Sequence, residues 1–155
     1  YFVDGLGAAQ FAIPGAVDRL RSARETPDPV IRPDDVPDPV VLASTDPAQP
    51  YGAALAWPDT SGRPARSASS IVVSRAGRPL VWFDRRGHHL VLFAEAVVDP
   101  SWADALVTLV KTDRARSIEV RKIDGNRLAD ASEGILQILR SAGFVDGYRG
   151  LTHRG

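Results

Sequence analysis

The sequence predicts an α+β domain: a small antiparallel β-barrel or sheet with two or three packed helices. Two observations carry this prediction. Six or seven short apolar segments are separated by tight turns, as in an antiparallel meander. Two longer segments, 100–115 and 130–142, repeat apolar residues at the spacing of an amphipathic helix. Helices grouped beside an antiparallel sheet, instead of alternating with parallel strands, define this class.

The first 25 residues predict the end of a winged-helix module. The apolar run 1–3 is followed by two glycines, and residues 10–13 provide a return strand. Pro14 suits the first turn of a helix, where a proline loses no hydrogen bond, and this helix is expected to end near Arg24. Two short strands and a helix in this order are typical of a wing and the segment that follows it.

Residues 26–39 predict an extended linker, because TPDPVIRPDDVPDP contains five prolines and no hydrophobic periodicity. The β-rich module is then expected over 40–155. An exposed basic loop, DTSGRPAR, is expected between its second and third strands. The first five strands of the module are predicted at 40–43, 52–57, 70–74, 79–83 and 89–93.

The remaining elements follow from periodicity and turn residues. In the helix predicted over 100–115, Trp102 and Leu106 lie on the apolar face, and Trp82 is expected in the core as well. A strand over 118–123 ends at an Asp-Gly turn. The second helix stops at Gly143, and a last strand spans 148–153.

Composition excludes several classes of protein. With 44% hydrophobic and 25% charged residues, the chain is an ordinary soluble globular sequence, and no apolar run is long enough to cross a membrane. Without cysteine it has no disulfide, thiolate zinc site or cysteine nucleophile. The net charge of zero provides no overall basic signal for nucleic acid. Since the sequence lacks methionine altogether, we expect it to be a piece of a longer protein.

Standard motifs for nucleotides, metals and nucleophiles are missing from the sequence. It has no glycine-rich phosphate loop followed by Lys-Ser/Thr, and no G-x-S-x-G elbow. His88 and His89 are adjacent, so on a strand they point to opposite faces and cannot hold one metal together. They are interpreted as solvent histidines beside a turn. We therefore expect no metal and no cofactor in this chain.

Asp46 is the best single candidate for acid or base chemistry. It lies in STDPAQPYGA, where two prolines stiffen the chain. The simpler interpretation is an Asx turn, in which the carboxylate caps the backbone. A carboxylate that accepts several N–H bonds has a lowered pKa and is a poor base near neutrality. It could still stabilise an oxocarbenium ion, as a DNA glycosylase requires.

Basic and aromatic residues alternate between positions 57 and 89. Arginines in predicted loops and turns, including Arg78, are interspersed with Trp57 and Trp82. Arginine beside an aromatic platform is typical of single-strand and minor-groove binding. A solvated basic rim on a β module is the alternative. The residues predicted to contact DNA are Arg63, Arg66, Arg85, Arg86, His88 and His89.

The segments YFVDGLGAAQFAIPGAVDRLR and VVLASTDPAQPYGAALAWP resemble the C-terminal region of bacterial large helicase-related (Lhr) proteins, which are superfamily 2 DNA helicases. GRPAR, VVSRAGRPLVWFDRRGHHLVLF, IEVRKIDG and LRSAGFVDGYRGL match in the same order, so the resemblance covers essentially the whole chain. It implies an ATP-driven 3′-to-5′ translocating core elsewhere in the parent protein, which holds ATP and Mg²⁺. Residues 1–25 would end the last winged helix, and 40–155 would form a barrel similar to that of helix-turn-helix DNA glycosylases.

The leading hypothesis is a non-catalytic accessory module of a DNA repair helicase, which binds single-stranded or tailed DNA or mediates assembly. The alternative is a glycosylase that excises uracil or alkylated bases. The Gln-apolar-Gln pair of those glycosylases is missing, and the tail YRGLTHRG has no acid after Asp146. A third hypothesis is a homo-oligomer paired through the apolar faces of the two helices, although these faces suit an intramolecular core equally well. The family resemblance implies the bacterial cytoplasm, in association with the nucleoid.

Overall fold

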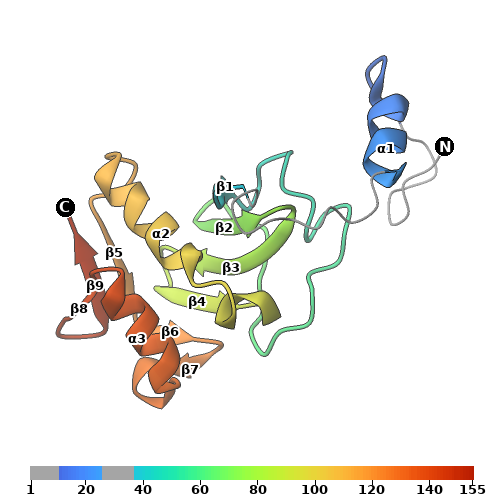
Figure 1. Cartoon of the computed structure of the whole chain (residues 1–155). Helices are drawn as coiled ribbons and strands as arrows, with labels where there is room; N and C mark the ends of the chain where they lie inside the picture. The colour runs from blue at the N-terminus through green and yellow to red at the C-terminus, as the bar shows by residue number, and fades with distance from the viewer. Residues whose placement is uncertain (1–10, 26–36) are drawn as a thin grey trace.

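The computed structural model describes residues 11–25 and 37–155 (Figure 1). Helix α1 (Ala16–Glu25) confirms the first predicted helix. The strand predicted at 1–3 and most of the proline linker lie outside the described residues. Residues 11–13, predicted as part of a return strand, belong to no strand in the structure. The predicted boundary between the two modules stays a prediction.

A six-stranded sheet forms the centre of residues 37–155 (Figure 1). Its first four strands are an antiparallel meander, which confirms four of the five strands predicted there. Two short strands extend the sheet beyond β4, the first of them parallel to it. The strands, in their order across the sheet, are β1 (Val40–Ala43), β2 (Ser70–Arg75), β3 (Arg78–Asp84), β4 (His89–Leu92), β6 (Lys122–Ile123) and β7 (Asn126–Arg127).

A second, three-stranded sheet has the order β5-β9-β8. Its strands are β5 (Ser117–Val120), β8 (Val145–Asp146) and β9 (Leu151–Arg154), all antiparallel. The single strand predicted over 118–123 is therefore wrong, because β5 and β6 belong to different sheets. The chain changes sheet at Arg121, where the N–H groups of Arg121 and Lys122 both donate to the carbonyl of His88.

The two sheets are open in the part of the chain that the structure describes. Each strand order ends in two unpaired edges, so these residues form no closed barrel. The expected α+β class with antiparallel sheets is confirmed, and the barrel form of that expectation is not. Closure would require β7 to pair with β1, but β7 has only two residues and follows the turn at Asp124–Gly125.

Helix α2 (Ser101–Lys111) joins the two sheets, because it contacts β1 and β2 of the first and β5 and β9 of the second. Trp102, in the first turn of α2, is fully buried, and its indole N–H donates to the carbonyl of Ala96 at 3.0 Å. The core prediction for this residue is confirmed. Helix α3 (Glu133–Ser141) adds Ile135 and Leu139 to the same core. Two 3₁₀ turns complete the helices: η2 (Ala94–Val97) and η3 (Leu128–Asp130).

The apolar faces of α2 and α3 are thus covered within the chain. Trp102, Leu106 and Leu139 are all in one continuous cluster with residues of both sheets. This confirms the intramolecular interpretation of their periodicity. Leu136 and Ile138 of the α3 face are only partly buried, and homo-oligomerisation stays a prediction. Among the described residues no helix is long and apolar enough to cross a membrane.

A second apolar cluster covers the other face of the meander. Trp82 lies in it, donating its indole N–H to the carbonyl of Ala65 at 2.9 Å. Trp57 stacks on Phe93 and on Tyr51, with ring centroids 6.0 and 6.1 Å apart. The loop between β1 and β2 therefore encloses this face, and both tryptophans pack instead of offering a free platform.

The strand predicted over 52–57 is wrong. One isolated bridge joins Tyr51 to Leu55, and the rest of the segment is turn and irregular chain. Gly52 has a φ of +74°, and a Cβ there would lie 2.4 Å from the indole nitrogen of Trp57. The segment bends because Trp57 must fold back onto the cluster, and a straight strand would carry it away.

Candidate functional site

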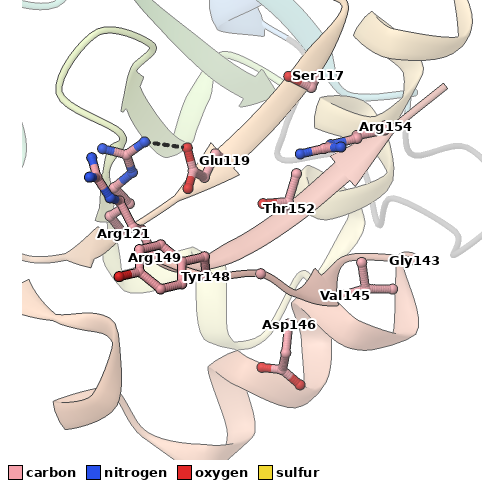
Figure 2. Close-up of a pocket in the computed structure, with 11 residues that line it drawn as sticks. Ser117, Glu119, Arg121, Gly143, Val145, Asp146, Tyr148, Arg149, Thr152 and Arg154 are labelled. Atoms are coloured by element: carbon pink, nitrogen blue, oxygen red, sulfur yellow. Dashed lines mark hydrogen bonds and ion pairs between the residues drawn. The ribbon is translucent and has the colours of Figure 1, made fainter.

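An open groove of about 780 Å³ lies on the solvent face of the three-stranded sheet (Figure 2). The register explains which side chains line it. Ser117 is opposite Arg154, and Glu119 is opposite Thr152. Since successive residues of a strand point to opposite faces, these four side chains share the outer face. The loop between β8 and β9 forms one wall of the groove.

Three arginines and two carboxylates line the groove, so its side chains carry a net positive charge. Arg121 Nη2 donates to Glu119 Oε2 at 2.6 Å, which leaves its own Nε buried without a partner. Arg149 and Arg154 make no hydrogen bond or ion pair with any side chain of residues 11–25 or 37–155. The guanidinium of Arg149 lies 6.0 Å from the ring centre of Tyr148. Two guanidinium groups are thus available to an incoming anion.

Two side chains, Arg121 and His88, lie close to the Glu119 carboxylate at one end of the groove. The hydrogen bond from Arg121 holds the pKa of the Glu119 carboxyl below its ordinary value, with a smaller contribution from the Arg121 charge. His88 Nδ1 lies 3.7 Å from the same carboxylate and 3.2 Å from the Glu119 carbonyl oxygen. Glu119 is therefore ionised at neutral pH and suited to hold a cationic neighbour in place.

A second hollow of about 420 Å³ continues the basic surface past Arg121 and Arg149, which line both. Arg127 and Arg140 line its far side. Both are paired: Arg127 with Asp130 at 3.4 Å, and Arg140 with Glu133 at 3.1 Å. The groove and this hollow together form a continuous basic surface, with Arg121 and Arg149 where they meet and Arg154 in the groove alone.

Two of the arginines predicted to contact DNA, Arg85 and Arg86, lie in the turn that follows β3, whereas Arg78 begins that strand at its other end. Arg85 donates to the carbonyls of Ser69 and Ala68 at 3.2 and 3.4 Å. Beside it, exposed Arg86 helps to line a shallow hollow of about 440 Å³. Their contact with DNA stays a prediction.

Arg63 and Arg66 lie in the loop between β1 and β2, with different surroundings. Arg63 is exposed, whereas Arg66 is half-buried and donates to the carbonyls of Gln49 and Tyr51 at 2.7 and 3.4 Å. It also reaches the Asp46 carbonyl at 3.4 Å. Arg66 therefore holds the 46–51 turn together, and its guanidinium has little freedom to bind a phosphate.

His88 and His89 point to different partners, as their adjacency predicts. His88 faces Glu119, while His89 Nε2 accepts the N–H of Gly125 at 2.8 Å and its ring meets Trp82 edge-on. Burial lowers the pKa of His89. Both rings are half-buried and engaged, so the expectation of solvent histidines is wrong. Within the described residues no group of three His, Asp or Glu side chains could hold a metal.

Asp46 has the geometry of a cap. Its Oδ1 accepts the N–H of Ala48 at 2.8 Å, and its carbonyl accepts the N–H of Gln49. The Asx-turn interpretation is confirmed. The buried side chain of Gln49 completes the turn, donating to the carbonyls of Ser44 and Tyr51 at 3.2 and 2.9 Å.

Sequence reasoning missed the groove residues Arg121, Tyr148, Arg149 and Arg154. The available signal was the alternation in SIEV and LTHR, which puts polar residues on one face of each strand. Nothing local in the sequence shows that these two segments pair.

Comparison with known proteins places the whole chain among related sequences. Residues 1–30 match the winged-helix domain of the large helicase-related protein. A protein of Mycolicibacterium smegmatis described as "Lhr helicase/ probable uracil glycosylase" is 45% identical over 163 aligned positions, which cover 99% of this chain. An Escherichia coli protein described as "Lhr helicase/uracil glycosylase" is 30% identical over 158 positions, which cover 97% of it. The chain spans only 11% and 10% of the lengths of these relatives.

Proposed function

The chain belongs to the large helicase-related (Lhr) family, and from this premise we propose that it is a DNA-contacting accessory region of an ATP-dependent DNA repair helicase. In this proposal the 3′-to-5′ translocating core, with its ATP and Mg²⁺, lies elsewhere in the parent protein. The region itself hydrolyses no ATP and works in the bacterial cytoplasm at the nucleoid. Its ligand is single-stranded or tailed DNA.

The arginine groove on the three-stranded sheet is the observation that carries this proposal. Arg149 and Arg154 make no hydrogen bond or ion pair with the described residues, and the groove that they line is open to solvent. An arginine fork matches the geometry of phosphate oxygens and can bind them through two hydrogen bonds. Glu119 fixes Arg121, so one of the three guanidinium groups is already oriented. A backbone of regularly spaced phosphates fits such a groove better than an isolated anion does.

The test measures binding of tailed DNA to the full chain by fluorescence anisotropy over a range of salt concentrations. Arg149→Ala with Arg154→Ala should weaken binding and lower the slope of log K against log salt by about 1.4, or about 0.7 for each lost contact to a single strand. Arg78→Ala is the matched control, because this exposed arginine lies at the far end of β3. Equal loss in the control, or an unchanged slope in the double variant, would refute the groove as the contact surface.

The same assay tests the arginines predicted from the sequence. In the Arg85→Ala, Arg86→Ala variant the slope should change less than in the groove variant, because Arg85 is bound to two backbone carbonyls. A larger change than in the groove variant would move the DNA contact to the β3–β4 turn.

A DNA glycosylase is the second candidate function, favoured by the descriptions of both relatives. Such an enzyme flips the target base out of the duplex and stabilises positive charge on the sugar. Carboxylates that could serve are Glu119 and Asp146 in the groove and Asp46 in its turn. The lowered pKa of Glu119 suits charge stabilisation and not proton donation.

An abasic-site cleavage assay on oligonucleotides containing uracil or alkylated bases tests this candidate. The variants are Asp46→Asn, Glu119→Gln and Asp146→Asn, assayed beside the unaltered chain. Loss of excision in one variant, with DNA binding retained, would identify the carboxylate. Activity in all three would exclude these residues from the chemistry, and no activity in the unaltered chain would remove the candidate function.

A further inference from the structure

Tyr148 belongs to neither apolar cluster of the described residues. Its side chain is 98% exposed, although tyrosine is a residue that normally buries its ring. It lies in the turn between β8 and β9, and this turn is ordered by a hydrogen bond from Gly147 N–H to the carbonyl of Gly150 at 2.8 Å. The fold therefore presents an aromatic ring to solvent on a well-defined loop.

The ring lies at the edge of the arginine groove. Tyr148 and Arg149 both line it, and the Arg149 guanidinium is 6.0 Å from the ring centre. In Figure 2 Tyr148, Arg149 and Arg121 lie toward one end of the groove, with Thr152 and Arg154 farther along it. The groove thus has an aromatic ring, that of Tyr148, at its edge, and the guanidinium groups of Arg149 and Arg154 supply positive charge and hydrogen-bond donors along it.

This combination distinguishes among nucleic-acid ligands. Binding of single strands without sequence preference combines a basic groove for the backbone with aromatic side chains on which bases stack. A paired base inside a duplex has both faces covered by its neighbours, so it cannot stack on a protein ring. An unpaired base offers a free face.

We propose that Tyr148 is a stacking platform for an unpaired base of a single strand, whose adjacent phosphates lie along Arg149 and Arg154. This inference rests on the proposed function, because it requires the groove to contact DNA. It adds the residue that selects an unpaired base over a base pair. Arg149 has two roles in this site: it binds phosphate, and its guanidinium lies over one face of the Tyr148 ring, so that the base stacks on the other face.

The experiment compares Tyr148→Ala and Tyr148→Phe with the unaltered full chain. The probes are a 20-nucleotide oligo-dT, an oligomer of the same length made of abasic residues, and a blunt duplex. Tyr148→Ala should bind oligo-dT between about five-fold and about a hundred-fold more weakly. The salt slope should stay unchanged, because no phosphate contact is lost. Tyr148→Phe should bind like the unaltered chain, since the phenol makes no hydrogen bond within the described residues.

The abasic oligomer isolates the stacking term. Tyr148→Ala and the unaltered chain should bind it equally, because it retains the phosphates and lacks the bases. The proposal is overturned if Tyr148→Ala binds oligo-dT as well as the unaltered chain does, or if it loses affinity equally for the abasic oligomer and the duplex. If the Arg149, Arg154 variant still weakens binding in that case, the groove remains a DNA contact. If neither Tyr148→Ala nor the Arg149, Arg154 variant changes binding, both the stacking proposal and the proposed function of the groove are refuted.

Discussion

Replacement of Gly150 by alanine should destabilise the module through a single backbone contact. A Cβ at this position would lie 2.1 Å from the carbonyl oxygen of Val120 and 3.1 Å from the Cα of Arg121. Carbon and oxygen atoms normally approach to about 3.3 Å, so the two backbones would have to separate by about 1.2 Å. The neighbour is main chain at the point where β5 passes to β6, and it cannot rotate away as a side chain would.

The expected cost is at the upper end of the range for an overpacked core, about 3 kcal/mol. For a chain of this length, this corresponds to a melting temperature lower by about 6–12 °C. Thermal unfolding of the full chain, followed by circular dichroism, measures the change. Since Gly150 follows Arg149 directly, DNA binding through the groove should weaken as well.

Gly134→Ala is the matched control, because no atom lies within 4 Å of a Cβ added there. It lies in the first turn of α3, where alanine favours the helix, so its melting temperature should rise slightly or stay constant. A Gly150→Ala variant that melts at the temperature of the unaltered chain would refute the argument. It would mean that β9 can move away from β5 at no cost.

Two further predictions concern stability. Burial lowers the pKa of His89 in the folded chain. As the pH falls below the ordinary histidine value of 6.5, the unfolded chain therefore binds a proton more readily than the folded chain does. The free energy of unfolding measured in urea should decrease over this pH range. Protonation would also remove the acceptor for the Gly125 N–H, and a His89→Gln variant should show a flatter profile. Gln49→Leu should cost about 2–4 kcal/mol, because the backbone N–H and C=O of Tyr51 lose their buried partner. Gln137→Leu, on the exposed face of α3, should change stability by less than about 0.5 kcal/mol.

The elements that sequence predicts correctly are those whose signals are local. The β2–β3–β4 meander follows from apolar runs separated by tight turns, and α2 and α3 follow from their periodicity. The apolar residues Ile118, Val120 and Ile123 predict one strand over 118–123, although Lys122 interrupts the alternation after Val120. Its division at Arg121 depends on the carbonyl of His88, about thirty residues earlier in the chain, and no local pattern records that contact.

The candidate site was harder to predict for the same reason. Proximity in sequence grouped Arg78 with Arg85, although an extended strand of seven residues holds them apart. The groove arginines Arg121 and Arg154 are separated by more than thirty residues in the sequence. Only the pairing of β5 with β9 brings both to one groove, where they lie at opposite ends of the paired strands. Charge patterns along a sequence identify a surface only where the topology is known.

The two faces of the three-stranded sheet have different surroundings. Ile118, Val120 and Leu151 point inward and belong to the same core as α2. Glu119 and Arg154 point outward into the groove, and Arg154 makes no ion pair with the described residues. Substitutions on the outer face remove no core contact, so a loss of DNA binding there can be attributed to the groove itself. Gly150 is different, because it lies where the wall of the groove meets the core backbone, and its replacement should change both properties together.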